Sequence, residues 1–363
     1  MGKFVLAIDS FKGCLSSAEV ELAAERGIRA VDEKAEIVSI PVSDGGEGML
    51  EAFNAALGGS VRRVSCHDPM MRPIMAEYGI IVQAGGYKTA IIEVAQVIGL
   101  SLVSQQERNV LIATSYGVGE LIYDAMQQEC THFIIGLGGS ATSDCGIGML
   151  RALINRFHGK DFNGIKEHFR NLHITLACDV QNPLYGEKGA AYVFGPQKGA
   201  DEQQVQLLDR RARTFAEMSA KYFGYDCSMQ IGAGAAGGLG YALMQYLDGK
   251  VLSGVELMLN LVAFDELLDN VSYVITGEGK ADRQTLMGKL PFGILSRAKR
   301  RQIRTILIAG QVSDQEQLLA AGFDAVLCIN PVNLDIKQAM NPVTAATNVE
   351  KTLTKWLREV QSL

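Results

Sequence analysis

The chain has 363 residues, of which 48% are hydrophobic and 20% charged, and its formal net charge at pH 7 is −6. This composition is typical of a globular protein of about two domains, and the negative charge argues against a nucleic-acid-binding protein. The sequence has no run of about 18 uncharged apolar residues, so no transmembrane helix and no membrane partner are predicted. Seven scattered cysteines without C-x-x-C spacing, and a start that lacks the apolar region of a signal peptide, predict a reduced cytoplasmic protein.

The N-terminal segment has the pattern strand, loop, helix, strand. KFVLAI (3–8) predicts a buried strand, and SAEVELAAERGIRAV (17–31) has apolar residues at helical spacing after a serine that can cap the helix. AEIVSIPV (35–42) predicts a second strand, which ends in the polar glycine turn SDGGEG (43–48). This βαβ pattern is typical of a parallel sheet.

The middle of the chain has a different pattern. RRVSC (62–66), IMAEYGIIV (74–82) and TAIIEVA (89–95) follow one another through short turns, which predicts successive antiparallel strands. Helical and strand-like segments then alternate, from SYGVGELIYDAMQ (115–127) to a long helix that begins near Asp201.

Near the C-terminus, the apolar run VSYVI precedes the charged stretch TGEGKADRQTLMGK (276–289). A Walker A loop ending at Lys289 would need a glycine at position 283 and a hydroxyl at position 290. The sequence has Arg283 and Leu290 there, so this interpretation fails. We predict a glycine-rich turn instead, and its charged residues are Glu278, Lys280, Asp282, Arg283 and Lys289.

These patterns predict an α/β fold with two domains. Residues 1–60 and 269–363 are expected to form a doubly wound parallel-sheet domain of flavodoxin/Rossmann-like type. Residues 61–268 are expected to form a second, inserted α/β domain that contains a mixed sheet.

In a doubly wound sheet, ligands bind beyond the carboxyl ends of the strands. Four strands of the first predicted domain end in DSFKG, SDGG, TGEGKAD and AGQVSD, which we expect at one edge of the sheet. Carboxylates and lysines there suit phosphoryl transfer, in which they hold magnesium, accept a hydroxyl proton or offset phosphate charge. The alternative is that these residues only form turns and helix caps. The residues concerned are Asp9, Lys12, Asp44, Glu278, Asp282 and Asp314.

The predicted second domain has three further glycine-rich stretches. GLGGSATSD (136–144) stands between a strand and a helix, so its N–H groups could bind an anion or form only a tight turn. GAGAAG (232–237) matches G-x-G-x-x-G after a poor strand, so a dinucleotide site competes with close backbone packing. The stretch from residue 177 to residue 200 adds Asp179, Asn182, Lys188 and Lys198.

Taken in order, these motifs resemble the bacterial type I glycerate kinases over nearly the whole chain. The resemblance implies a two-domain α/β kinase that uses ATP and magnesium to phosphorylate D-glycerate. The product is 2-phosphoglycerate in the enterobacterial members, and 3-phosphoglycerate is the alternative. Cys145 departs from the family, which commonly has glycine at that position. The motifs are DSFKGCLS, PVSDGGEG, EVAQVIGL, ATSYGVGELI, GLGGSATSDCGIGM, ACDVQNPLYGEKGA, FGPQKGA, GAGAAGGLG and TGEGKADRQTLMGKLPFG.

On this interpretation, each candidate residue has a predicted role. The predicted catalytic residues, three of them rival bases, are Asp44, Asp179, Asp282 and Lys289. The predicted substrate-binding residues are Ser10, Lys12 and Arg283. The predicted nucleotide- and phosphate-binding residues are Gly138, Gly139, Ser140, Gly277 and Gly279. The predicted magnesium ligands are Asp144 and Glu278. The rival functions are an NAD-dependent hydroxy-acid dehydrogenase and a small-acid sensor without turnover.

Overall fold

The structure, a computed structural model, describes residues 2–42, 48–83 and 85–362. The chain divides into two compact units. The first consists of Met1–Asp44, Glu51–Leu57 and Val255–Leu363, and the second of Gly45–Leu50 and Gly58–Gly254. The predicted domain boundaries lie after residues 60 and 268, and that division into domains stays a prediction.

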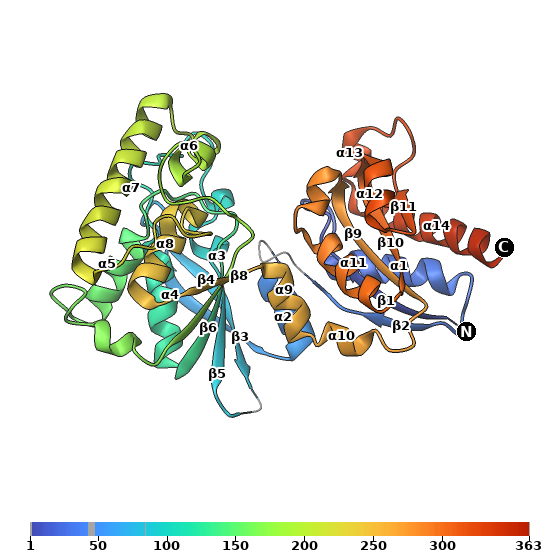
Figure 1. Ribbon diagram of the computed structural model, residues 1–363, viewed down its shortest axis with the longest axis horizontal. Helices are drawn as coiled ribbons and strands as arrows, with labels where there is room; N and C mark the ends of the chain where they lie inside the picture. Colours follow the sequence, from blue (N-terminus) through green and yellow to red (C-terminus); the bar gives the residue numbers. More distant parts are fainter. Residues whose placement is uncertain (1, 43–47, 84, 363) are drawn as a thin grey trace. The chain divides into compact units, whose positions relative to one another are not determined.

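The first unit is built on a five-stranded parallel sheet in the order β11-β10-β9-β1-β2 (Figure 1). Numbered along this unit, the order is 2-1-3-4-5, which is the flavodoxin-like, doubly wound order with its ligand site between the first and third strands. The predicted doubly wound parallel sheet is therefore confirmed. The strands are β1 (Lys3–Ile8), β2 (Glu36–Ser39), β9 (Tyr273–Ala281), β10 (Arg304–Val312) and β11 (Ala325–Cys328).

Helices cover both faces of this sheet. α1 and α14 pack together over the face that carries Leu6 and Ile8, whereas α11 and α12 cover the face that carries Leu307. α1 begins with a capping box in which Ser16 and Glu19 each satisfy the other's backbone N–H, as the predicted serine cap requires. The helices are α1 (Ser17–Arg29), α9 (Gly254–Leu261), α10 (Phe264–Leu267), α11 (Leu290–Arg300), α12 (Gln315–Ala321), α13 (Ile336–Ala339) and α14 (Pro342–Gln361), and α2 (Met49–Leu57) has residues in both units.

The predicted glycine-rich turn at 276–289 is wrong for residues 276–281, because these residues continue β9 to Ala281. β10 extends equally far, and the two strand ends pair with each other in register, with Lys280 opposite Gln311. Gly277 allows this close pairing, since a Cβ atom there would lie 2.4 Å from the carbonyl oxygen of Ile308. Since side chains alternate along a strand, Glu278 and Lys280 project from the same face of β9.

The second unit contains a six-stranded mixed sheet in the order β3-β4-β5-β6-β7-β8, which confirms the predicted mixed sheet. β3, β4 and β5 pair antiparallel, and β5 to β8 pair parallel. α7 begins with a capping box at Asp201, where the long helix was expected. The elements are β3 (Ser60–His67), β4 (Pro73–Val82), β5 (Lys88–Glu93), β6 (Cys130–Gly136), β7 (His173–Ala177), β8 (Lys250–Leu252), α3 (Ala95–Ile98), α4 (Tyr116–Gln127), α5 (Ile147–Arg156), α6 (Ala190–Phe194), α7 (Glu202–Phe223) and α8 (Ala235–Leu247).

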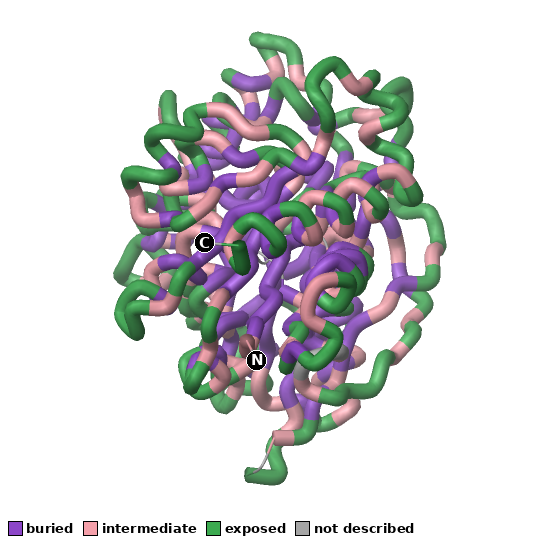
Figure 2. The backbone as a smooth tube through the Cα atoms, turned by 90° about the vertical axis from the view of Figure 1, so that its right-hand side faces the viewer, coloured by how far each residue is buried: buried purple, intermediate pink, exposed green. Residues whose placement is uncertain are grey.

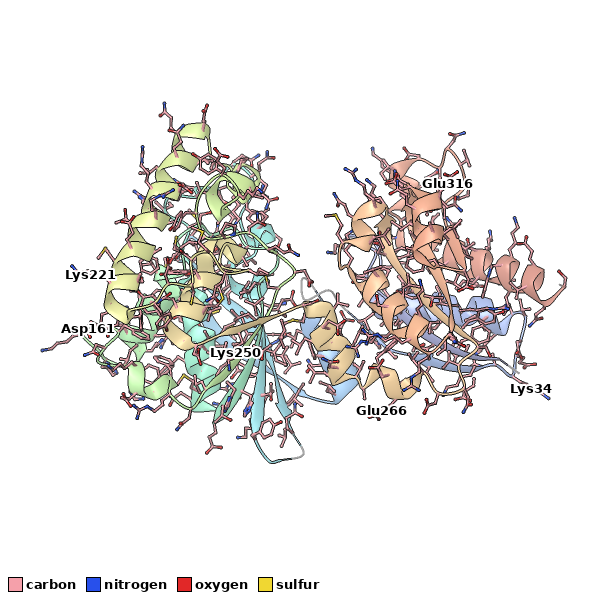
Figure 3. The ribbon with its side chains drawn as sticks, viewed as in Figure 1. Lys34, Asp161, Lys221, Lys250, Glu266 and Glu316 are labelled. Atoms are coloured by element: carbon pink, nitrogen blue, oxygen red, sulfur yellow. The ribbon has the colours of Figure 1, made fainter. Side chains whose placement is uncertain are left out.

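Burial follows the two sheets. The buried parts of the backbone trace run through the interior, and exposed residues lie on the outer turns and helices (Figure 2). Charged side chains extend outward from the ribbon, among them those of Lys34, Asp161, Lys221, Lys250, Glu266 and Glu316 (Figure 3). None of the helices within the described ranges combines the length and apolar character needed to cross a bilayer.

Candidate active site

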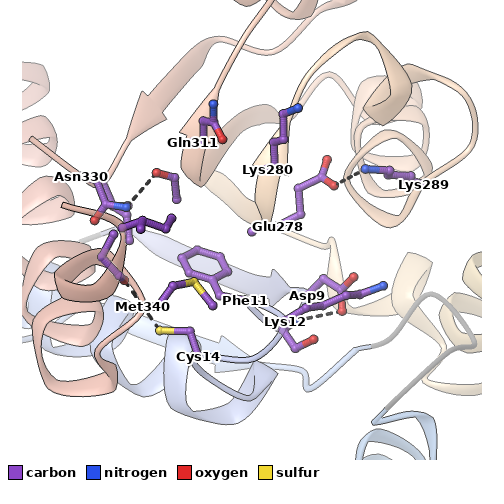
Figure 4. A pocket seen from close by; sticks show the side chains of 16 residues that line it. Asp9, Phe11, Lys12, Cys14, Glu278, Lys280, Lys289, Gln311, Asn330 and Met340 are labelled. Atoms are coloured by element: carbon purple, nitrogen blue, oxygen red, sulfur yellow. Dashed lines mark hydrogen bonds and ion pairs between the residues drawn. The ribbon is translucent and has the colours of Figure 1, made fainter. Parts of the chain in front are cut away.

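The first unit has a cavity of about 360 Å³ at the carboxyl ends of β1, β9 and β10 (Figure 4). This is the point between β1 and β9 where the strand order reverses, the usual ligand site of a doubly wound sheet. One part of the lining is apolar, with Phe11, Ile336 and Met340. The predicted site residues that line it are Ser10, Lys12, Glu278, Gly279 and Lys289, and Asp9 and Lys280 join them.

The loop after β1 is held in place by two side chains of α1. The Ser17 hydroxyl donates to the carbonyl oxygen of Ile8 (2.6 Å), and the N–H of Ile8 donates to Glu21 Oε1 (3.2 Å). Burial raises the pKa of Glu21 to about 9, so the carboxyl group is protonated at neutral pH. Beyond Ile8, Asp9 accepts the N–H of Ser10 on Oδ1 (2.8 Å), which sets both residues at the cavity.

Glu278 and Lys289 form the main ion pair of the cavity. Lys289 Nζ donates to Glu278 Oε2 (2.7 Å), and the Thr285 hydroxyl donates to Oε1. The side chain of Glu278 is buried, whereas that of Lys289 remains 39% exposed. Figure 4 shows the two groups facing each other at the cavity. An ammonium group has three donors, so Lys289 can bind an anion in the cavity while keeping its bond to Glu278.

Asp282 and Arg283 do not line this cavity. Asp282 is the N-cap of a short 3₁₀ turn and accepts the N–H of Gln284 on Oδ1 (2.8 Å). That backbone hydrogen bond lowers the pKa of Asp282, and the neighbouring Lys280 contributes in the same direction. Arg283 is exposed, and its N–H donates to Asp314 Oδ2 (3.2 Å). Their predicted catalytic and substrate-binding roles stay predictions.

Gly277 also lies away from the lining, inside the sheet. Its carbonyl oxygen accepts the N–H of Asp9 (3.0 Å), and the residue pairs with Ile8 and Ile308 in the strand register. It therefore contributes to the site by holding the end of β1 against β9. Asp44, another predicted base, lies outside the described residues.

The second unit brings several predicted residues to one edge of its sheet. Glu93, Gly136 and Ala177, at the ends of β5, β6 and β7, lie opposite one another in register. The loops that follow β6 and β7 therefore leave the sheet at the same edge, and they carry the predicted glycine loop 138–140 and Asp179. Asp179 is exposed there.

The glycine loop 138–140 has open donors. Gly139 is left-handed, with a φ of 71°, and its carbonyl oxygen accepts the N–H of Leu100 (2.8 Å). Within the described ranges, the backbone N–H groups of Gly138, Gly139 and Ser140 donate no hydrogen bond. Successive open N–H groups of this kind form a concave site for an anion.

Lys198 lies beneath this loop and is 3% exposed. Its Nζ donates to the carbonyl oxygen of Thr142 (2.7 Å) and to the Ser140 hydroxyl oxygen (3.1 Å). Burial lowers the pKa of Lys198 to about 8, although the charge of Asp144 opposes this shift. Sequence reasoning noted Lys198 only as part of a motif, because a lysine after a glycine-proline turn gives no local sign of burial.

Asp144 fastens the starts of α4 and α5 to each other. Its Oδ2 accepts the N–H and the hydroxyl of Ser115 (2.8 and 2.9 Å) and the N–H of Gly148 (3.0 Å), while Oδ1 accepts the N–H of Gly146 (3.1 Å). These bonds occupy most of the lone pairs that a magnesium ion would need. Among the described residues, no three His, Cys, Asp or Glu side chains are grouped to hold a metal ion.

Glu93 is a candidate that sequence reasoning missed. This carboxylate is 4% exposed at the end of β5 and accepts the N–H groups of Gly48 (3.3 Å) and Leu50 (3.4 Å), at the start of α2. A glutamate at the end of an apolar strand, beside the strand that leads to the glycine loop, was the available signal.

The GAGAAG stretch packs backbone against backbone. Turns rather than a strand precede it, and α8 begins within it with a left-handed kink at 236–238. A Cβ atom on Gly237 would lie 1.9 Å from the carbonyl oxygen of Thr142, and one on Gly234 would lie 2.4 Å from that of Pro183. The strand-turn-helix context of a dinucleotide site is absent from residues 224–240, so the dehydrogenase interpretation loses its basis.

Comparisons with known proteins agree on one family. The model of the glycerate kinase family matches residues 4–167 and 153–361. The glycerate kinase of Halalkalibacterium halodurans is 38% identical over 359 residues, which cover 94% of each chain. The glycerate 2-kinase of Escherichia coli (strain K12) is 40% identical over 346 residues, which cover 90% of each. A solved structure from Salmonella typhimurium LT2, described as a candidate glycerate kinase 2, superposes with a TM-score of 0.84 at 35% identity and covers 100% of both chains.

Proposed function

Since this chain belongs to the glycerate kinase family, and is therefore a kinase, we propose that it transfers the γ-phosphoryl group of ATP to a hydroxyl group of D-glycerate. The observation that carries the proposal is the cavity at the β1–β9 switch point, where Lys12, Lys280 and Lys289 meet the carboxylates of Asp9 and Glu278. Phosphoryl transfer depends mainly on positioning and charge neutralisation, which such a set of groups supplies.

The lysines of the cavity are proposed to bind the negative charges of the reactants. Lys289 is held by Glu278 with donors to spare, and Lys12 projects from the β1 loop beside Ser10. We propose that Lys12 and Ser10 bind the glycerate carboxylate and that Lys289 stabilises the transferred phosphoryl group. Arg283 remains a proposed substrate contact that would need to approach from outside the cavity.

In the proposed step, the glycerate hydroxyl oxygen forms a bond to the γ-phosphorus and the bond to the bridging oxygen of ADP breaks. The hydroxyl proton passes to a carboxylate. The proposed acceptors are Asp44, Asp179 and Asp282, and the buried Asp9 of the cavity is added to them. Gly138, Gly139 and Ser140 are proposed to bind the ATP phosphates through their open N–H groups.

Magnesium is proposed to accompany ATP. Magnesium usually needs one or two protein carboxylates, and the phosphates and water complete its octahedron. Glu278 fits this requirement, because each of its oxygens accepts a single hydrogen bond and keeps a lone pair. Asp144 fits less well, since Ser115 and Gly148 already occupy its Oδ2. When bound, the ion would neutralise charge on the β- and γ-phosphates.

The proposed product is 2-phosphoglycerate, and the support for it is the 40% identity to a protein named glycerate 2-kinase. 3-Phosphoglycerate is the rival product. The proposed role is in the catabolism of small organic acids. Because ATP is the proposed phosphoryl donor, we also propose that the protein works in the cytoplasm.

The test is an assay of purified protein with D-glycerate, ATP and magnesium, each omitted in turn. We expect ADP to form only when all three are present. Coupling to enolase without phosphoglycerate mutase separates the products, because enolase consumes 2-phosphoglycerate and not its isomer. Turnover of a different hydroxy acid would refute the substrate, and bound glycerate without ADP formation would identify a sensor.

A further inference from the structure

We propose that Lys198 is a positioning residue that makes the Ser140 hydroxyl and the loop 138–140 a donor site for the phosphates of a nucleotide. Lys198 does so from behind the loop, without touching the nucleotide itself. This inference rests on the proposed phosphoryl transfer, because it assigns the loop to the ATP phosphates.

The hydrogen bond between Lys198 and Ser140 has only one possible direction. An ammonium group can only donate, so the Ser140 oxygen must be the acceptor of its 3.1 Å bond from Lys198 Nζ. The Ser140 proton is then left for a different acceptor, and the part of the chain that the structure describes offers none. The hydroxyl therefore joins the open N–H groups of Gly138, Gly139 and Ser140 as a fourth donor.

The charge of Lys198 has no bonded counter-charge among the described residues. Within the described residues, Lys198 forms no ion pair, and its two bonds go to a hydroxyl and to the Thr142 carbonyl. Asp144 acts on Lys198 only through its field, and its carboxylate oxygens are bonded to Ser115, Gly146 and Gly148. The ammonium group of Lys198, a residue that is 3% exposed, thus lies next to the loop with the open N–H groups and has no bonded counter-charge among the described residues.

Packing alone does not account for a lysine at position 198. An unpaired buried cation costs stability. A methionine would avoid this cost, although it would leave the Thr142 carbonyl oxygen without the donor that Lys198 supplies. A nucleotide phosphate on the outer side of the loop would supply the missing negative charge, so the cost is offset when the ligand binds.

The rival explanation is structural. Lys198 could simply fasten the segment 194–200 to the loop through its bonds to Ser140 and Thr142. The two explanations differ in what happens when the charge is removed. If Lys198 is only a structural contact, replacing it should lower the melting temperature and weaken the binding of all ligands alike. If it is a positioning residue, replacing it should weaken the binding of phosphates selectively.

The experiment compares Lys198→Met, Ser140→Ala and the double variant with the wild type. Calorimetry measures the binding of AMP, ADP and ATP in one magnesium-containing buffer, and the glycerate assay gives kcat and KM. Lys88→Met is the matched control, because Lys88 is a lysine of the same unit whose Nζ bonds a carbonyl oxygen and Glu129 at the amino end of β5.

We expect Lys198→Met to weaken ATP and ADP by on the order of tenfold to a hundredfold, the value of a hydrogen bond to a charged group, and AMP by much less. KM for ATP should rise by a similar factor. Ser140→Ala should reproduce part of the loss, and the double variant should lose no more than Lys198→Met, because the two residues act through one contact. Lys88→Met should bind all three nucleotides as the wild type does.

Unchanged ATP binding by Lys198→Met would overturn the inference, as would equal losses for AMP and ATP with a lower melting temperature. If Lys198→Met fails to fold, Ser140→Ala still decides, since it removes only the fourth donor. The wild type could bind ATP more tightly than Lys198→Met, as expected, and still leave D-glycerate unphosphorylated. That result would refute the proposed substrate and support the inference. A wild type that binds no ATP would refute both.

Discussion

Glu21 offers a direct test of how burial changes the pKa of a carboxyl group and the stability of the first unit. This α1 side chain is 1% exposed, its Oε1 accepts the N–H of Ile8, and its Oε2 has no partner among the described residues. Burial raises its pKa from 4.5 to about 9. The carboxyl group is therefore neutral in the folded protein at pH 7 and ionised in the unfolded chain.

The magnitude follows from this difference in pKa. A raised folded-state pKa adds stability below pH 4.5, and this contribution is lost as the pH rises towards 9. At pH 7 the loss corresponds to about 2.5 pH units, or about 3.5 kcal/mol at about 1.4 kcal/mol per unit. Glu21→Gln has the shape of the neutral carboxyl group without its titration. We expect it to match the wild type near pH 4.5 and to exceed its free energy of unfolding by about 3.5 kcal/mol at pH 7.

The assay is urea unfolding between pH 4.5 and pH 9, followed by tryptophan fluorescence. The chain has a single tryptophan, Trp356, and it belongs to the same core cluster as Ile8 of β1 and Val20 of α1. The signal therefore reports on the unit that contains Glu21. Glu25→Gln is the control on the same helix, since Glu25 makes a partly exposed pair with Arg29, and a change within about 0.5 kcal/mol is expected. A Glu21→Gln variant that is less stable at pH 7 would show that the carboxyl group is ionised and stabilised, and would refute the reasoning.

Three further variants test the site and its support. Lys289→Met should lower kcat by on the order of a hundredfold, because Glu278 loses its bonded cation and the phosphoryl group loses a hydrogen-bond donor. An unchanged kcat in the glycerate assay would show that Lys289 has only a structural role. Gly237→Ala should cost about 2 kcal/mol or more in thermal unfolding, because its Cβ would lie 1.9 Å from a carbonyl oxygen at a φ of +65°. Asp144→Asn should destabilise the second unit by on the order of 2–4 kcal/mol, since an amide cannot accept all the bonds made to the carboxylate; an equal melting temperature would contradict this.

The carboxyl-terminal edge of the parallel sheet could be predicted from two features of the sequence, the apolar runs and the polar segments that follow them. Apolar runs such as KFVLAI end at charged, glycine-containing segments, and in a parallel sheet those ends share an edge. The residues predicted to share this edge are Asp9, Lys12, Asp44, Glu278, Asp282 and Asp314. Among them, Asp9, Lys12 and Glu278 line the cavity, Asp282 and Asp314 do not, and Asp44 lies outside the described residues. Their predicted roles remain proposals.

What could not be predicted depends on non-local backbone pairing. Local glycines and charges at 276–281 indicate a turn, but β10 supplies hydrogen-bond partners for this segment as far as Ala281. The same extension points Glu278 and Lys280 into the cavity and leaves Asp282 to cap the next turn. Strand ends are set by the partner strand, which a single stretch of sequence does not contain.

Cys145 adopts a backbone conformation that is unusual for its residue type. It lies beyond the glycine loop and has a φ of 57°, in the left-handed region that favours glycine. The cysteine is buried and its N–H donates to the carbonyl oxygen of Gly237 (3.0 Å). Contacts of the side chain and this hydrogen bond therefore hold a conformation that the residue type does not prefer.

Glu21 and Lys198 share a feature that points to function. Each is a buried ionisable group whose pKa shifts towards the neutral form, and each lies directly behind a loop proposed to bind a reactant. Glu21 bonds the N–H of Ile8, just before Asp9 and Ser10, and Lys198 bonds Ser140. Burying an ionisable group costs stability at both positions, so stability alone does not account for them. Local features that cost stability are expected at functional sites, where the bound ligand offsets the cost. Burial of Glu21 and Lys198 therefore supports the proposal that the β1 loop and the glycine loop bind the reactants, and this support does not depend on the sequence motifs.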